Sequence, residues 1–287
     1  MIENTTYPTI SEVGTALETW AQPGWAQSYD NVGLQVGDAR RTVQRSLIAL
    51  DLTPAVLDEA RQHGATLIIT HHPLVFTPLR SVTADGFVSN LALRLAETGI
   101  ALYSIHTNLD AAPGGVSFAL AERLDLRAVR FLDALETSSP PLGPSTIQAG
   151  LGAVGRLAAP MPLKAFLQHV AERLHAGSLR YVGDAEAAVE TVAVCGGSGS
   201  SFTPQALRAG ADAYVTADVT YHKFFDVLDL DGRPRMALID AGHYETEALT
   251  EELLQNWLSR RFPAVEWHRT ATRTSPMDTF VPGKDDV

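Results

Sequence analysis

Short apolar runs alternate with segments of helical period along almost the whole chain, and this alternation is what most limits the possible folds. Strands are predicted at Ser46–Leu52, Thr66–Thr70, Ile100–Ile105, Thr191–Cys195, Ala213–Thr216, Arg235–Ile239 and Ala264–His268. Helices are predicted near Pro54–Gly64, Ser89–Thr98, Val116–Leu124, Leu163–His175, Thr203–Ala209 and Thr246–Arg260. Strands that alternate with helices form βαβ units, whose parallel sheets are covered by helices. The sequence therefore predicts an α/β fold with mostly parallel sheets flanked by helices.

A stretch rich in Ser, Pro and Gly, Glu136–Gly150, interrupts this pattern and is typical of a linker or a long surface connection. With 287 residues, the chain is long enough for two domains of ordinary size. We therefore expect two α/β lobes. Residues 1–130 and 236–287 would form the first lobe, to which the C-terminal segment returns, and residues 131–235 the second. The tail after Thr270 contains several prolines and is expected to be poorly ordered.

The charge balance and the cysteine content disfavour several classes of protein. Asp and Glu number 33 against 22 Lys and Arg, and the net charge of −11 repels nucleic-acid backbones and anionic membrane surfaces. No run of about 18 apolar residues is present that could span a membrane. The single cysteine, Cys195, excludes an intramolecular disulfide framework, and residues 1–13 lack the features of a secretory signal. We therefore expect a cytoplasmic protein that binds neither membranes nor nucleic acid.

Three of the predicted strands run directly into polar turns that contain histidine. These turns carry the side chains His71, His72, His106, Asp110, His243 and Glu247. In open α/β sheets, ligands bind in the crevice outside the carboxyl ends of the strands, so the three turns are expected to converge on one site. One histidine after a strand is usually a turn or capping residue. Three such turns favour a shared function.

The residue types in these turns fit divalent metal ions. His106 and Asp110 are four residues apart, so in a helical turn they lie on one face and can close on one ion. His243 and Glu247 have the same spacing, and the adjacent His71–His72 can send one ring to each of two neighbouring ions. Neutral imidazoles with carboxylates, and no thiolate, suit Zn, Fe, Mn or Co. Two such ions about 3.5–4 Å apart would form a hydrolytic centre.

Three other polar motifs each allow two interpretations. The turn Cys195–Ser201 follows a strand and precedes a helix, so its amides either bind an anion or only permit a tight turn. Asp218 and His222 form either a further metal pair or, as we favour, pocket lining or a helix cap. Asp30 and Asn31 either orient a ligating imidazole or form an Asx-turn. The other histidines, His63, His169, His175 and His268, are interpreted as surface or packing residues.

Six motifs, taken in order, cover nearly the whole chain. They are SYDNVGLQVG at 28–37, LIITHHPL at 67–74, HTNLDAAPGGV at 106–116, VAVCGGSGSS at 192–201, YVTADVTYH at 214–222 and DAGHYETE at 240–247. Together they resemble the motif set of the GTP cyclohydrolase 1 type 2 homologue family. The resemblance implies a dinuclear metal protein that assembles into a toroidal homohexamer.

The resemblance also implies roles for individual residues. The positions that match metal ligands are His71, His72, Asp110, His243 and Glu247, with Glu247 bridging the two ions. His106 matches a cavity position, as a weak ligand or a proton carrier.

The chain departs from the family pattern at a few positions that touch no expected ligand. Tyr29 stands where Trp is usual, Ala217 where Gly is common, and Ser117–Phe118 where Asn-Asp is frequent. These departures concern only the pocket wall. The length of the chain argues against the extra domain that longer relatives carry between the lobes.

Together, the residues and the resemblance predict a metal-dependent hydrolase with two divalent ions per chain, Zn, Fe or Mn. Its substrate would be a nucleotide-like or phosphorylated small molecule, and His106, or less favourably His222, would carry the proton. The alternative is a non-enzymatic role, in which the metal stabilises a ring-shaped scaffold for protein partners. Open coordination positions would favour the enzyme, whereas a shell closed by protein ligands would favour the scaffold.

Overall fold

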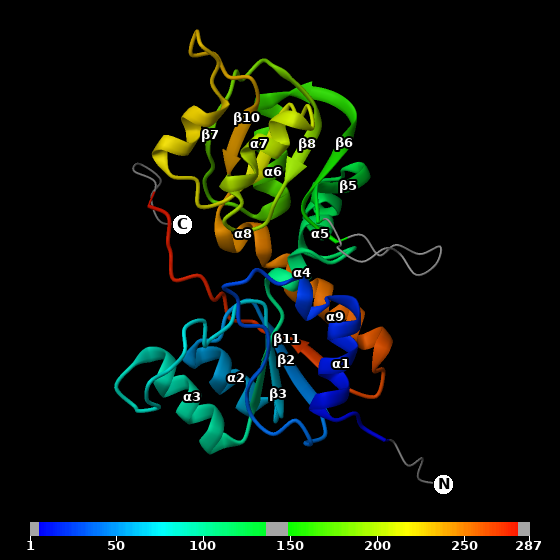
Figure 1. Cartoon of the computed structure of the whole chain (residues 1–287), viewed down its shortest axis with the longest axis vertical. Coiled ribbons are helices and arrows are strands. Elements are labelled where there is room, and N and C mark those ends of the chain that lie inside the picture. The colour runs from blue at the N-terminus through cyan, green and yellow to red at the C-terminus, as the bar shows by residue number, and fades with distance from the viewer. Residues whose placement is uncertain (1–5, 136–148, 281–287) are drawn as a thin grey trace.

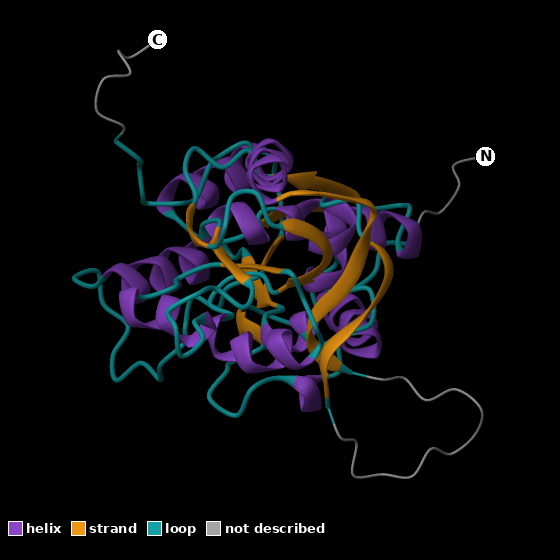
Figure 2. Ribbon diagram, turned by 90° about the horizontal axis from the view of Figure 1, so that it is seen from above, coloured by secondary structure: helices purple, strands orange, loops and turns teal. Residues whose placement is uncertain are grey.

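The computed structural model of the protein describes residues 6–135 and 149–280. Two sheets lie one beyond the other along the long axis of the molecule (Figure 1), and helices surround both when the molecule is seen from above (Figure 2). The predicted α/β class is therefore confirmed. Nearly all of the predicted linker, residues 136–148, lies outside the described residues.

The first sheet has five strands in the order β1-β4-β3-β2-β11. They are β1 (Gly33–Val36), β4 (Ala101–Ser104), β3 (Leu67–Thr70), β2 (Arg45–Ala49) and β11 (Glu266–Arg269). Strands β4, β3, β2 and β11 are parallel, and only the edge strand β1 is antiparallel to its neighbour. The C-terminal strand β11 thus returns to the sheet that the N-terminal part of the chain begins.

Helices cover both faces of this sheet. They are α1 (Ile10–Trp20), α2 (Pro54–Gln62), α3 (Phe87–Thr98) and α9 (Leu249–Arg261). Along β2, Leu47 packs into the cluster formed with α2 and α3, whereas Ile48 packs into the cluster on the opposite face. Alternating side chains of a strand point to opposite faces, so a strand covered on both sides consists of a continuous run of apolar residues.

The second sheet has six strands in the order β5-β6-β8-β9-β10-β7. They are β5 (Arg127–Ala134), β6 (Gly150–Pro162), β8 (Ala188–Val194), β9 (Ala213–Thr216), β10 (Ala237–Asp240) and β7 (Arg180–Val182). Only β8, β9 and β10 are parallel, so this sheet is mixed rather than mostly parallel as expected. The difference arises because β5, β6 and β7 were not predicted as strands.

The helices of the second lobe are α5 (Val116–Arg123), α6 (Leu163–Leu174) and α7 (Thr203–Arg208).

The boundaries between the two lobes lie at residues other than those predicted from the sequence. Strand β5 begins in the second sheet at Arg127, and β10 pairs with β9 there, although residues from 236 onward were expected in the first lobe. The return to the first lobe therefore begins after β10, with α9 and β11.

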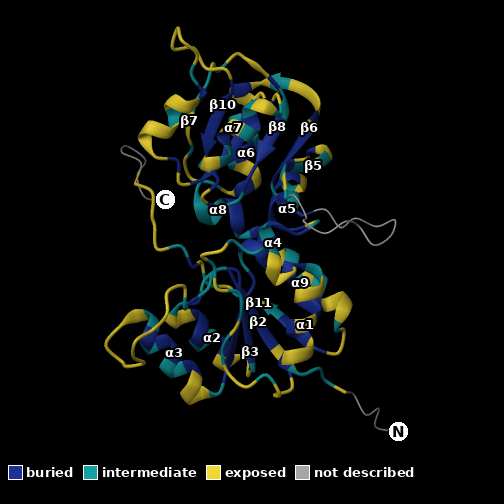
Figure 3. Ribbon diagram, viewed as in Figure 1, coloured by how far each residue is buried: buried dark blue, intermediate teal, exposed yellow. Residues whose placement is uncertain are grey.

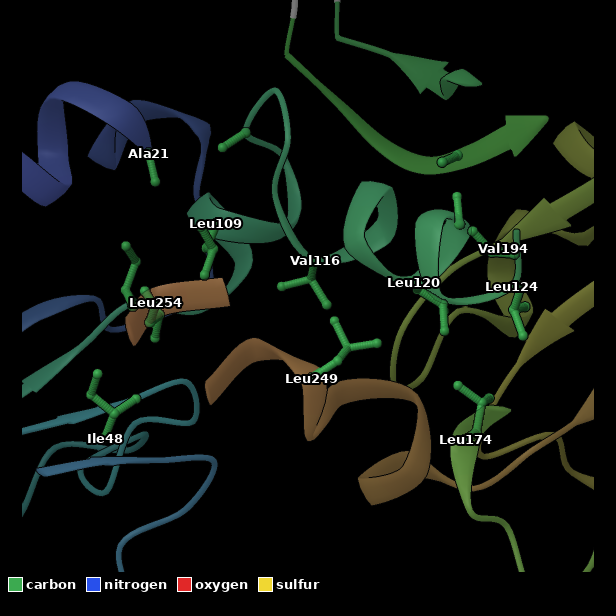
Figure 4. Close-up of a cluster of buried hydrophobic side chains, with 14 of the residues drawn as sticks. Ala21, Ile48, Leu109, Val116, Leu120, Leu124, Leu174, Val194, Leu249 and Leu254 are labelled. Carbon is green, nitrogen blue, oxygen red and sulfur yellow. The ribbon is translucent and has the colours of Figure 1, made fainter. Parts of the chain in front are cut away.

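The largest apolar cluster is shared by both lobes. It includes Ile48 of the first sheet and Val194 of the second, and residues of α5 and α9 connect them (Figure 4). The labelled side chains of the connecting region are Leu109, Val116, Leu120, Leu124, Leu249 and Leu254. Figure 3 shows the buried residues running through both sheets and through the helices between them. None of the helices in residues 6–135 and 149–280 is long and apolar enough to cross a membrane.

Candidate metal centre

The carboxyl ends of the parallel strands of both sheets meet between the lobes. Strands β2, β3 and β4 end there from the first sheet, and β8, β9 and β10 end there from the second. Two short helices come directly after, α4 (Thr107–Asp110) after β4 and α8 (His243–Glu247) after β10, and Figure 1 shows both between the sheets. This is the region where α/β sheets bind ligands.

The three predicted turns come together at this junction. Their side chains form three groups whose potential ligand atoms lie within 4.8 Å of one another. The groups are His71–Asp110–Glu247, His72–His243–Glu247 and His71–His72–His106. The structure therefore has histidine and carboxylate groups that could hold a metal ion, and they contain all six side chains of the predicted turns.

Glu247 belongs to two of the groups through different oxygen atoms. Its Oε2 lies 2.9 Å from Nε2 of His72 and 3.0 Å from Nε2 of His243. Its Oε1 lies 3.8 Å from Nε2 of His71. The Glu247 side chain is buried, so the fold directs one oxygen to His72 and His243 and the other to His71.

His71 has a buried ring nitrogen without a hydrogen-bond partner. The side chain is fully buried, and its Nδ1 lies 2.9 Å from the carbonyl oxygen of Ile105, to which it can only donate. Nε2 then carries a lone pair, and it faces Asp110 Oδ1 at 3.6 Å and Glu247 Oε1 at 3.8 Å, with no hydrogen bond to either. A buried acceptor directed at carboxylate oxygens lacks a positively charged partner. A divalent cation fits this set of donors.

The other three histidines are each oriented by an aspartate on Nδ1. The pairs are His72–Asp51 at 2.7 Å, His243–Asp218 at 2.7 Å and His106–Asp30 at 2.8 Å. Such carboxylate–histidine pairs are typical of metal sites, where they fix the tautomer and the direction of the ring. In each pair the second nitrogen, Nε2, is the one left for the cluster.

These contacts decide between several of the alternatives. Asp30 orients His106, and the amide that donates to Asp30 is that of the adjacent Asn31 and not of the residue two positions on, as an Asx-turn requires. Asp218 orients His243 instead of pairing with His222. His222 is exposed next to the ring of Tyr221, and among the described residues it belongs to none of the three groups.

The glycine-rich turn after β8 brings the backbone close to Glu247. Gly197 has φ +57°, and a Cβ there would lie 2.2 Å from Glu247 Oε1. The Gly197 amide already donates to Thr246 Oγ1, and the Gly199 amide donates to Thr216 Oγ1. Because both amides are satisfied within the fold, the contacts favour the tight-turn interpretation at these two positions.

Two contributors were not predicted from the sequence. Asp51 comes after β2 just as His71 comes after β3, but a single acid after a strand is too common to single out. Thr274 lies in the irregular C-terminal segment, and its Oγ1 donates to Asp51 Oδ2 at 2.7 Å. The neighbouring Ser275–Met277 line a cavity of about 280 Å³ together with His72 and other site residues. This part of the tail is therefore tied to the site, contrary to the expected disorder after Thr270.

Burial and hydrogen bonding set the charges of the cluster. Burial raises the pKa of the Asp110 carboxyl. Burial alone would lower the pKa of His72, but hydrogen bonds to Asp51 and Glu247 outweigh it and raise this pKa to about 10. The same balance, with Glu247 and Asp218 as partners, raises the pKa of His243 to about 9. Protons shared with Glu247 thus compete with a metal ion for the same nitrogen atoms.

Comparison with known proteins identifies the family of the chain. Residues 8–276 match the model of a family described as Duf34/NIF3 (NGG1p interacting factor 3). The chain belongs to the Duf34/NIF3 family. Among curated Duf34/NIF3 relatives, a Streptomyces coelicolor protein named GTP cyclohydrolase 1 type 2 homolog is 41% identical over 242 residues, which cover 84% of this chain and 82% of the relative. A protein of the same name from Streptococcus pneumoniae is 31% identical over 273 residues, covering 93% and 97%.

Two solved structures share the fold of this chain. A Bacillus cereus protein described as related to NIF3 superimposes with a TM-score of 0.85 at 25% identity, covering 96% of this chain and all of the other. Reduced HcgD from Methanocaldococcus jannaschii superimposes with a TM-score of 0.75 at 28% identity, covering 94% of this chain and all of the other. The resemblance inferred from the six motifs is therefore confirmed.

Proposed function

We propose that this centre holds two divalent metal ions and that the protein is a metal-dependent hydrolase of a nucleotide-like or phosphorylated small molecule. The observation that carries the proposal is the lone pair of His71 Nε2, fully buried and directed at two carboxylates without a hydrogen bond. The names of the curated relatives support the class of substrate.

The three groups suggest how the ligands divide. His71, Asp110 and one oxygen of Glu247 would hold one ion. His72, His243 and the other oxygen of Glu247 would hold the second. Imidazole and carboxylate ligands suit Zn, Fe or Mn. Such a pair of ions, when bound, supplies Lewis-acid activation of water and of a substrate oxygen.

The protein residues keep the centre positive and partly open. Asp110 and Glu247 bring two negative charges to two divalent cations, while neutral imidazoles add none, so net positive charge remains for an anionic substrate. Three protein ligands for each ion leave coordination positions free, which favours the enzyme over the scaffold alternative.

His106 is the residue best placed to carry a proton. Asp30 accepts the Nδ1 proton of His106 at 2.8 Å, which leaves Nε2 to receive or deliver a proton. The His106 side chain is partly exposed, and its ring packs against those of both His71 and His72. His222, the other residue predicted for this role, has none of these contacts among the described residues.

Metal content tests the ligand assignment. Elemental analysis of the purified protein should give about two divalent ions per chain, and His71→Ala and Glu247→Gln should lose at least one of them. His63→Ala serves as the control, because His63 stacks on His268 outside the cluster. Unchanged metal content in both site variants would refute the assignment.

Turnover tests the reaction. A screen of nucleotides, phosphoesters and purine-ring compounds should reveal hydrolysis by the metal-loaded protein that disappears with a chelator and in Glu247→Gln. If a broad screen finds no such turnover while the assembly stays intact without metal, the scaffold alternative replaces the hydrolase.

We also propose a toroidal homohexamer acting in the cytoplasm. The hexamer is inferred from the family resemblance, and the location from the buried, unpaired Cys195, which suits a reducing compartment. Light scattering should report about six times the mass of one chain, and a monomer at micromolar concentration would contradict the assembly.

A further inference from the structure

Two exposed aromatic rings stand next to the candidate metal centre. The Tyr29 side chain is 63% exposed and that of Phe76 46%. Their ring centroids lie 6.1 Å apart with the planes tilted by 53°. The Phe76 ring in turn meets the edge of His106 at 6.4 Å, and His106 belongs to the cluster of histidines. A continuous set of rings therefore leads from solvent to the centre.

Polar contacts hold this aromatic pair in place although the apolar core does not. Asn31 Nδ2 donates to the carbonyl oxygen of Val75, and the Val75 amide donates to Gln35 Oε1 at 2.9 Å. Gln35 Nε2 donates to the carbonyl oxygen of Asn31 at 2.8 Å. Side chains of the segment that carries Tyr29 thus bind both the carbonyl and the amide of Val75, the residue before Phe76.

The segment that carries Tyr29 is also tied to the centre. The next residue, Asp30, orients His106 and accepts a hydrogen bond from the Thr107 amide at 3.1 Å. Burial, and then the charges of Asp30 and Asp110, raise the pKa of the Tyr29 hydroxyl. The aromatic pair therefore has a defined position relative to the proposed ligands.

We propose that Tyr29 and Phe76 form a stacking surface for a planar heteroaromatic ring of the substrate, such as a nucleobase. This inference rests on the hydrolase proposed above, whose substrate would place its reacting group at the metal ions and its ring on the aromatic pair. Since the two rings are tilted and already touch, the ligand ring stacks on their exposed faces and does not insert between them. Stacking tolerates different bases, because every base has a π-face.

Binding affinity tests the stacking surface without any need for turnover. Calorimetry on the full-length, metal-supplemented protein would compare adenosine and guanosine 5′-monophosphate with ribose 5-phosphate, which lacks the ring. Tyr29→Ala and Phe76→Ala should weaken the binding of both nucleotides about tenfold and leave ribose 5-phosphate unchanged. Tyr29→Phe keeps the ring and should bind as the wild type does. Phe87→Ala removes an equally exposed ring, 62% exposed at the start of α3, and should also change nothing.

Several results would overturn the inference. Ribose 5-phosphate could bind the wild type as tightly as the nucleotides, or the alanine variants could weaken all three ligands equally. The alanine variants could also dissociate the assembly in light scattering, which would assign the aromatic pair to a contact between copies of the chain. Ring-dependent binding without any metal-dependent hydrolysis would refute the hydrolase alone. Metal-dependent hydrolysis by a protein whose nucleotide affinities both alanine variants leave unchanged would refute the stacking surface alone.

Discussion

A single glycine, Gly197, determines where the Glu247 carboxylate can lie in the candidate centre. Its left-handed conformation turns the chain after β8, and the missing Cβ leaves the space that Glu247 Oε1 occupies. A side chain at this position would displace the carboxylate that joins the two groups of ligands. The glycine therefore serves both the turn and the site.

Gly197→Ala should reduce the metal content of the protein by at least one ion per chain, because Glu247 has to move away from the cluster. Gly210→Ala is the matched control, since Gly210 has φ +70° but nothing within 4 Å of the added Cβ. Both variants carry the same backbone strain, of about 1–2 kcal/mol. Elemental analysis and thermal unfolding separate the two effects, and equal metal loss in both variants would argue against the special role of Gly197.

Glu251 is a buried carboxyl near the centre whose ionisation opposes folding. It accepts a hydrogen bond from the Leu50 amide at 3.0 Å, and burial raises its pKa from 4.5 to about 7. A carboxyl with a raised pKa in the folded state stabilises the fold in its protonated form. Stability from this residue is therefore lost as the pH rises from about 4.5 to about 7.

Glu251→Gln should be more stable than the wild type at pH 8, by about 1–3 kcal/mol, and nearly equal to it at pH 5. Chemical denaturation at both pH values measures this difference. The neighbouring Glu252→Gln is the control, because the Glu252 side chain is about half exposed and pairs with Arg123 at the surface. A stabilisation by Glu251→Gln of the same size at both pH values would contradict the explanation.

Up to residue 280, the irregular segment after β11 contains no helix or strand, yet hydrogen bonds tie it to helix α2 and to the candidate site. Glu59 of α2 accepts hydrogen bonds from Thr270 and Thr272 and from the Ala271 amide, at 2.8 Å for the amide. Thr274 then reaches Asp51, the partner of His72. The segment is thus anchored at its start and joined to the site further along.

Thr274→Val should weaken the binding of one metal ion by about three- to tenfold, because Asp51 loses a hydrogen bond that helps to orient His72. Thr272→Val loses a similar hydrogen bond in the same segment, but to Glu59, and should leave metal affinity unchanged. Competition titration with a chromophoric chelator measures both affinities. Equal weakening in the two variants would mean that the segment as a whole, and not the contact with Asp51, matters.

Elements with continuous apolar runs were predictable from the sequence. Strands β3 and β9 lie within one residue of the predicted spans, because each is buried on both faces. Strand β6 escaped prediction because it contains Gly152, with φ +64°, and Gly155, whose backbone approaches the chain of β5. Helix α1 was missed although Thr9 and Glu12 form a capping box. Its apolar residues Ile10, Val13 and Leu17 have helical spacing, so this helix was predictable from the sequence and was overlooked.

The candidate site was predictable only for residues that closely follow a strand, because contacts between residues far apart in the sequence leave no local pattern. His71 and His243 come shortly after strands, and residues that succeed parallel strands gather at the carboxyl edge of the sheet. The pairing of Asp51 with Thr274 joins residues 223 positions apart, and no local pattern encodes it. The orienting role of Asp218 was hidden for the same reason, because its partner His243 belongs to another strand end.

At the scale of the whole molecule, the two lobes share one core and one candidate site. The largest apolar cluster runs from the first sheet to the second, and ligands of each proposed ion come from both lobes. Separate unfolding of either lobe would expose this cluster. The lobes are therefore expected to unfold together.

Thermal unfolding followed by tryptophan fluorescence and by far-UV circular dichroism should give one common midpoint. All four tryptophans lie at positions 20, 25, 257 and 267, on the side of the first lobe and α9, whereas circular dichroism reports on both sheets. Removal of metal by a chelator should lower this midpoint by about 5–10 °C, because ions that bind only the folded state stabilise it. Two distinct midpoints would show that the lobes are independent.

The order of residues around the centre has a consequence for how the protein is made. His71 and His72 leave the ribosome well before Glu247, which joins the two ligand groups, and Thr274 follows later still. At about 5–20 residues per second, roughly 10–40 s separate the first proposed ligands from the last. During that interval the nascent chain carries adjacent histidines without the carboxylate that completes either group. Neither group of proposed ligands can therefore be completed before Glu247 has been synthesised.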